Sequence, residues 1–166
     1  MDKLIAVIVL IFVIAVLICG ELYFKMEKNR TIANSILNDM QPGLFEWTEA
    51  ADSLFEACGG KYPGLFQAQA NIIRSVSKKH PAGQVDPLNQ ICSLAKQAVS
   101  EHLSDSVISG YARHLSEKAA DLFDMREEYN KTAAALNEQL GGPLYALLGR
   151  LFHIEKMTLL SALTVL

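Results

Sequence analysis

The stretch that decides the fold runs from Leu115 to Leu140 and reads "LSEKAADLFDMREEYNKTAAALNEQL". Its seam residues recur at alternating intervals of four and three, which is the heptad spacing of a helix that packs against partner helices. One helix cannot bury such a stripe alone, so the pattern predicts an all-α protein built as an antiparallel four-helix-type bundle with long helices. The seam positions are Leu115, Ala119, Leu122, Arg126, Tyr129, Ala133, Leu136 and Leu140.

Polar residues interrupt this seam at regular places. Arg126 occupies a seam position, and Asn130 and Asn137 flank the seam one heptad apart. Buried polar groups are costly unless they are hydrogen-bonded, so we expect partners on a facing helix or loop. Alanines at 133–135 would let that partner come close. Two interpretations stay open: a polar network that fixes helix register, or a small-ligand pocket around Arg126.

The rest of the body also has helical spacing and contains no alternating β-strand pattern. The long helix is expected to begin near Ser104 or Asp105 and to extend for about 55 Å. Asp86 followed by Pro87 predicts another helix start, because Asp caps free N–H groups and proline suits the first turn. Pro42 is expected to kink or end the first helix. The other breaks are Gly59-Gly60, Pro63-Gly64, Pro81 to Pro87 and Gly141-Gly142-Pro143.

The N-terminus predicts a membrane anchor. Residues 4–20, "LIAVIVLIFVIAVLICG", carry no charge, and the apolar stretch continues past Glu21 to Phe24. At about 1.5 Å per residue, residues 4–24 span about 31 Å, which matches a hydrocarbon core about 30 Å thick. A cleaved signal peptide would have a shorter apolar run and a small-x-small site, and bulky Ile18 before Cys19 does not suit a lipoprotein signal.

These features predict three regions, a transmembrane anchor at 1–24, a juxtamembrane helix continuation at 25–42 and a helical bundle at 43–166. Lys25, Lys28 and Arg30 follow the apolar stretch, whereas only Lys3 precedes it. The positive-inside rule therefore favours a single-pass membrane protein whose body faces the cytoplasm.

The remaining residues do not predict chemistry. A formal net charge of −3 and a sequence pI of about 5.8 exclude a large basic face for nucleic acid. None of the four histidines has a second His or Cys at helical ligand spacing, so we expect no metal site. No phosphate-binding loop or nucleophile elbow is present, and we expect no cofactor, no catalytic residue and no enzyme activity. Three cysteines, an odd number, do not form a disulfide framework.

The polar stretch also resembles the C-terminal signature of the LemA family, R-x-x-YN followed by a second Asn, a Pro and A-x-x-G. The order and spacing of an upstream tryptophan and a "YPGLF" element resemble that family too, although Gly64 stands where the family usually has Asn. The residues that carry the resemblance are Trp47, Tyr62, Pro63, Leu65, Arg126, Tyr129, Asn130, Asn137, Pro143, Ala146 and Gly149.

The resemblance implies a bacterial, single-pass, N-terminally anchored membrane protein with an antiparallel helical bundle. One branch of the family serves magnetosome membrane formation, which suggests membrane organisation as a role. We therefore expect a non-enzymatic interaction or scaffold protein that contacts the bilayer through residues 4–24 and binds a protein partner or itself. The alternative is a ligand- or signal-sensing bundle with a polar pocket around Arg126.

The C-terminal tail is the last predicted element. Pro143 is expected to open a helix that continues to Leu166, with apolar residues over about half of its circumference. Such a wide apolar face needs a cover. It could pack on the bundle, on another copy of the chain or on the membrane surface, and we expect the bundle.

Overall fold

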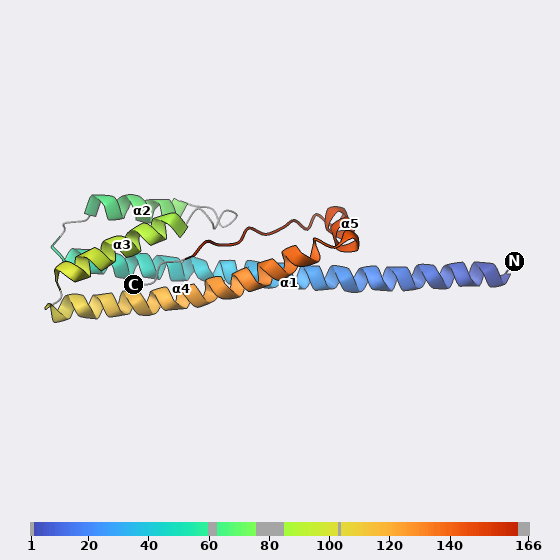
Figure 1. Ribbon diagram of the computed structural model, residues 1–166, viewed down its shortest axis with the longest axis horizontal. Helices are drawn as coiled ribbons and strands as arrows, with labels where there is room; N and C mark the ends of the chain where they lie inside the picture. The colour runs from blue at the N-terminus through green and yellow to red at the C-terminus, as the bar shows by residue number, and fades with distance from the viewer. Residues whose placement is uncertain (1, 60–62, 76–84, 103, 163–166) are drawn as a thin grey trace. The chain divides into compact units, whose positions relative to one another are not determined.

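The chain is helical throughout most of its length in the computed structural model, which describes residues 2–59, 63–75, 85–102 and 104–162 (Figure 1). The prediction of an all-α protein is confirmed for these residues. The long predicted helix, expected from about 104 to 140, is α4. The five helices are α1 (Asp2–Ala57), α2 (Pro63–Ser75), α3 (Val85–Glu101), α4 (Ser106–Gln139) and α5 (Pro143–Leu151).

The chain divides into two compact units, each with its own hydrophobic core. Unit 1 comprises Met1–Asn34 and Lys131–Thr158, and unit 2 comprises Ser35–Asn130 and Leu159–Leu166. In each unit a part of α1 and a part of α4 contribute buried side chains to the core. Seam residues of α4 are therefore buried in the cores of both units.

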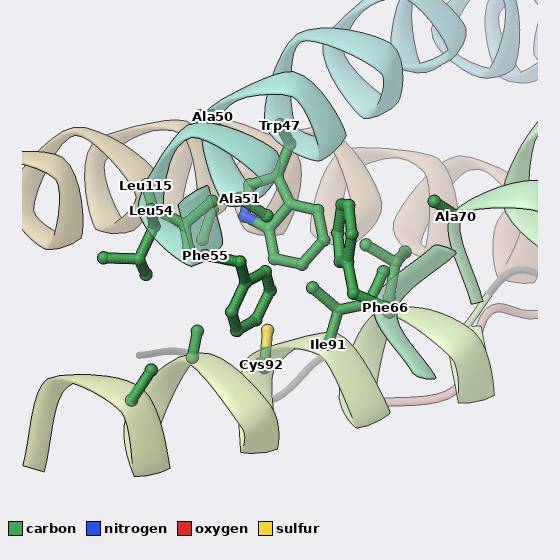
Figure 2. Close-up of a cluster of buried hydrophobic side chains, with 14 of the residues drawn as sticks. Trp47, Ala50, Ala51, Leu54, Phe55, Phe66, Ala70, Ile91, Cys92 and Leu115 are labelled. Atoms are coloured by element: carbon green, nitrogen blue, oxygen red, sulfur yellow. The ribbon is translucent and has the colours of Figure 1, made fainter. Parts of the chain in front are cut away.

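Four helices contribute to the core of unit 2. Trp47 of α1 is 1% exposed and lies at the centre of the cluster (Figure 2). The rings of Phe55 of α1 and Phe66 of α2 pack at a tilt of 47° with their centroids 5.0 Å apart. Ile91 of α3 lies beside them, and Leu115 of α4 belongs to the same cluster. Large aromatic side chains bury the most apolar area per residue, so this cluster is the main source of hydrophobic stabilisation in the unit.

The first helix does not end at Pro42, so the prediction that it could end there is wrong. α1 continues through Pro42 to Ala57, although the proline removes one helical hydrogen bond. Met40 and Leu44, on either side of it, are both buried in unit 2, and this packing offsets the lost bond. A Cβ added at Gly43 would lie 3.2 Å from Leu122 Cδ2, so the glycine permits close approach of α4.

In unit 2, α1 and α4 run antiparallel. Gly43 lies against Leu122, and three residues later Glu46 accepts a 2.6 Å hydrogen bond from Lys118 Nζ, four residues earlier on α4. Rising numbers on one helix thus meet falling numbers on the other, which confirms the predicted direction for this pair.

The core of unit 1 joins the middle of α1, the end of α4, α5 and the chain that follows α5. Its buried members are Met26, Leu136, Leu140, Leu148 and Ile154. Pro143 opens α5 as predicted, with Gly142 as an extended N-cap residue. Proline at the first helical position loses nothing, because its missing N–H would have no helical partner there.

The helix predicted from Pro143 to Leu166 is wrong for residues 154–162, and residues 163–166 lie outside the described residues. His153 adopts the left-handed conformation, with φ of 54°, and Ile154 N donates to Gly149 O at 2.8 Å. This is the six-to-one hydrogen bond of a Schellman-type helix end. From Ile154 to Ala162 the chain has no helix or strand, and we call these residues the tail.

Gly149 allows Leu140 and Ile154 to come close at this helix end. A Cβ at Gly149 would lie 2.6 Å from Leu140 Cδ2 and 3.1 Å from Ile154 O, so Gly149→Ala should lower the free energy of unfolding by about 1–3 kcal/mol. Denaturant titration of the full chain in detergent, followed by circular dichroism, measures this. The control is Gly110→Ala, an exposed α4 glycine whose added Cβ meets nothing within 4 Å and which should stabilise by about 0.5–1 kcal/mol. Equal effects of both variants would contradict the close-approach argument.

The first part of α1 is uncovered. Its large apolar side chains from Leu4 to Ile18 are 47–67% exposed, and no described part of the chain packs on them. By length and composition α1 can cross a membrane, a criterion that a signal sequence near an N-terminus also meets. The structure thus supports a single N-terminal membrane-crossing segment at this coarse level.

Candidate functional site

The predicted seam of α4 is buried at every position except one. Leu115, Ala119, Leu122, Tyr129, Ala133, Leu136 and Leu140 are all at most 8% exposed. Arg126 is the exception, and its side chain is 12% exposed. The polar residues that interrupt the seam do meet hydrogen-bond partners, as predicted. Those partners belong to the main chain of the tail.

In unit 1, Asn137 holds the tail at Met157. Its Nδ2 donates to Met157 O at 2.7 Å, and Met157 N donates to Asn137 Oδ1 at 2.8 Å. The carboxamide thus satisfies the N–H and the C=O of one residue at once, as a neighbouring β-strand would. We call this pair of bonds an asparagine clamp.

Unit 2 contains a second asparagine clamp with the same geometry. Asn130 Nδ2 donates to Leu160 O at 2.9 Å, and Leu160 N donates to Asn130 Oδ1 at 2.8 Å. Arg126 adds a bond from Nε to Ser161 O at 2.6 Å and a longer one from Nη2 to Leu160 O at 3.4 Å. From α3, Asn89 Nδ2 donates to Ala162 O at 3.1 Å. Three consecutive tail carbonyls therefore have side-chain donors.

The two clamps have a simple register. Asn130 and Asn137 are seven residues apart on α4, which corresponds to about 10.5 Å of helical rise. Leu160 and Met157 are three residues apart, which corresponds to about 9–11 Å of extended chain. These two spacings along the chain are similar, and the later asparagine holds the earlier tail residue. Asparagines seven residues apart on a helix are therefore spaced to hydrogen-bond every third residue of an extended segment.

The side chains of the tail follow the same repeat of three. Ile154 and Leu160 are buried, Met157 is half-buried, and the residues between them are exposed. The clamps bind the main chain and are indifferent to side-chain identity, so specificity for this segment comes from its three apolar residues.

Arg126 also makes an ion pair and a cation–π contact. Its Nη1 lies 3.2 Å from Glu127 Oε1, and its guanidinium carbon lies 5.8 Å from the centre of the Phe123 ring. Together with the tail carbonyls these contacts use donors on all three guanidinium nitrogens. A small ligand at Arg126 would have to displace the tail.

The other described residues that carry the family resemblance pack in the core or belong to helices α2 and α5. Trp47 and Tyr129 are buried in unit 2, and burial raises the pKa of Tyr129. Pro143 and Gly149 shape the two ends of α5, and half-buried Ala146 lies within it. Pro63 is the first residue of α2 and Leu65 lies in its first turn, whereas Tyr62 is outside the described residues.

No protein-family model, curated protein or solved structure matches the chain.

Sequence reasoning missed part of the site. Asn89 carries no signal, because an asparagine on an amphipathic helix is usually a surface residue. The expectation that alanines 133–135 let the partner approach is wrong for two of them, since Ala134 and Ala135 are exposed and only Ala133 is buried. The apolar repeat at 154, 157 and 160 was the available signal for an extended tail, since a repeat of three also fits an extended chain.

The described residues offer hydrogen bonding to main chain rather than reactive groups. Within them, no group of three or more His, Cys, Asp or Glu side chains could hold a metal ion. Cys58 and Cys92 are buried, and burial raises the pKa of both thiols, that of Cys92 to about 11. Because the thiolate is the reactive form, these two cysteines should be poor nucleophiles at neutral pH.

Proposed function

We propose that this protein is a single-pass, N-terminally anchored membrane protein of the LemA type, whose helical body serves as a non-enzymatic interaction or scaffold module on the cytoplasmic side. The observation that carries the proposal is the uncovered apolar segment of α1. Its large side chains between Leu4 and Ile18 are about half to two-thirds exposed. A contiguous apolar surface of this extent is unstable in water and suits lipid.

The composition of the body supports an interaction role. Its two cores are apolar and its polar seam residues bind the chain's own tail, so the described side chains form a stable helical framework. The family resemblance gives the same expectation of an anchored helical bundle, with membrane organisation as its cellular role. A bacterial membrane location and a protein partner, or a second copy, belong to the same proposal.

The anchor is tested by placing two arginines in the middle of the apolar segment, Leu10→Arg with Ile14→Arg. Each arginine at the centre of a bilayer costs about 2.5–3.5 kcal/mol, so the variant should leave the carbonate-washed membrane fraction while the unchanged protein stays in it. Leu10→Ala with Ile14→Ala is the matched control and should remain in the membrane. Mass spectrometry showing that the membrane-fraction protein lacks its first ~20 residues would contradict an uncleaved anchor.

The orientation is tested with Ser109→Cys, an exposed position on α4. With the body in the cytoplasm, a membrane-impermeant maleimide should label this cysteine only after the cells are opened. Rapid labelling on intact cells would place the body on the opposite side. The chain without Ser109→Cys is the control, and its buried Cys58 and Cys92 should take up little label.

A further inference from the structure

Helix α5 has two apolar faces, and unit 1 covers only one of them. Leu148 and Gly149 are buried in the core of unit 1. On the other side Leu144, Leu147 and Leu151 are 44%, 63% and 67% exposed. At about 100° per residue these three leucines share an arc of about 60°. Three aligned leucines in water are an interaction surface rather than scattered exposure.

The uncovered face lies beside the end of the apolar segment of α1. Phe152, directly after α5, is 44% exposed and has its ring centroid 4.5 Å from that of Tyr23. Tyr23 in turn lies 5.7 Å from the ring of Phe24, which is 72% exposed. Tyr145 of α5 and Leu22 of α1 pack against the same unit-1 core. α5 is thus attached to α1 where residues 4–24 end.

Aromatic residues at this place are typical of a membrane–water interface, where an amphipathic ring sits at the level of the headgroups. If α1 crosses the bilayer, Tyr23 and Phe24 lie at the interface, and contact with Tyr23 brings Phe152 and α5 to the same level. An exposed leucine face at that level would meet the acyl-chain boundary.

The polar surroundings of α5 favour lipid headgroups over a second copy of the chain. A surface hollow of about 430 Å³ is lined by Arg150, His153 and Lys156 together with Glu155, and Leu140 and Ile154 form part of its floor. Lys25 and Lys28, which follow the aromatic residues of α1, are also exposed. Basic residues beside an apolar face suit anionic headgroups, whereas a second copy would bring the same positive charges.

We propose that α5 is an interfacial helix, whose Leu144, Leu147 and Leu151 insert into the cytoplasmic leaflet while Arg150 and Lys156 contact lipid phosphates. The inference rests on the proposed anchor and extends it, because the membrane then binds two elements of unit 1. α5 would set the height of unit 1 at the membrane surface.

Fluorescent labelling of the full chain in vesicles tests whether the leucine face of α5 inserts into the membrane. An environment-sensitive dye is attached at Leu147→Cys for α5, at Leu10→Cys for the anchor, or at Ser109→Cys as an exposed control on α4, each with Cys19→Ser. The protein with Cys19→Ser alone checks that buried Cys58 and Cys92 stay unlabelled. Vesicles contain phosphatidylcholine and phosphatidylserine, and quenchers are a shallow lipid-borne nitroxide or aqueous iodide.

We expect the dye at Leu147 to show blue-shifted emission, strong quenching by the shallow nitroxide and weak quenching by iodide. The dye at Ser109 should show the reverse. Quenching of Leu147 by iodide, with Leu10 shielded from it, would overturn the interfacial helix and leave the anchor intact. Iodide quenching at Leu10 would overturn the anchor itself. A dye at Leu147 shielded from both quenchers would indicate a covering second copy and also contradict lipid contact.

Leu144→Cys provides a second reporter on the same face, because a dye there should behave as the dye at Leu147 does. Since both leucines are exposed, neither substitution removes core packing. Opposite behaviour at the two positions would show that the leucine face does not insert as a unit.

Discussion

Replacing Trp47 with alanine should lower the free energy of unfolding by about 3–5 kcal/mol, the largest effect we expect from a single substitution in this chain. The indole is 1% exposed and lies among side chains from α1, α2 and α3 in unit 2 (Figure 2). Its removal leaves a cavity that rigid neighbours such as Phe55 and Phe66 cannot fill without moving. Denaturant titration of the full chain in detergent, followed by helical circular dichroism, measures the loss.

Trp47→Phe separates packing from hydrogen bonding at this site. The indole Nε1 is buried without a hydrogen-bond partner, so phenylalanine removes an unsatisfied N–H while it keeps most of the ring volume. We therefore expect Trp47→Phe to cost at least about 2 kcal/mol less than alanine. The control on the same helix is Phe45→Ala, a 40% exposed position where the loss should stay below about 1 kcal/mol. Equal losses for Trp47→Ala and Phe45→Ala would contradict the assignment of Trp47 to the core.

The second large effect is expected at the asparagine clamps. Asn137→Ala or Asn130→Ala should each cost about 1–3 kcal/mol, because each strands an N–H and a C=O of the tail that the carboxamide satisfied. The most direct readout is hydrogen exchange, and the amide of Met157 or Leu160 should exchange about 5- to 150-fold faster in the matching variant. The exposed neighbour Lys131→Ala is the control and should leave both rates unchanged.

Substitution by aspartate gives a sharper test because it keeps the shape of the side chain. In Asn137→Asp one carboxylate oxygen can still accept from Met157 N, but the other replaces a donor and faces Met157 O. Two acceptors in contact repel, so aspartate should release the tail at least as much as alanine does. If aspartate instead protected the tail as well as asparagine does, the paired donor and acceptor would not be what holds it.

Several features could be read directly from the sequence. The intervals of four and three in α4 predicted its length and its buried side, because a heptad pattern makes one face of a helix apolar and therefore buried, whichever element packs against it. The charge-free run at the N-terminus likewise predicted an apolar segment of membrane-spanning length. The break at Gly141-Gly142-Pro143 predicted the start of α5, because proline fixes the backbone angle that a first turn needs.

Other features depended on contacts between distant residues. Pro42 was expected to kink or end α1, but the helix does not end there, because packing Met40, Leu44 and Trp47 in unit 2 offsets the loss of one hydrogen bond. The local sequence reveals the hydrogen bond lost at the proline. It does not reveal the compensating packing, since the packing partners lie on other helices.

The tail shows most clearly which features the sequence determines and which depend on the tertiary structure. By itself the sequence determined that residues after Pro143 are apolar enough to need a cover, and that Arg126, Asn130 and Asn137 need partners. An apolar repeat near three fits both a helix face and an extended segment, so the sequence alone could not choose between them. The tertiary structure decided it, because a helical tail would use its own N–H and C=O groups. The asparagines of α4 offer those same groups partners at Met157 and Leu160, and the chain satisfies both needs by leaving the helix after Leu151.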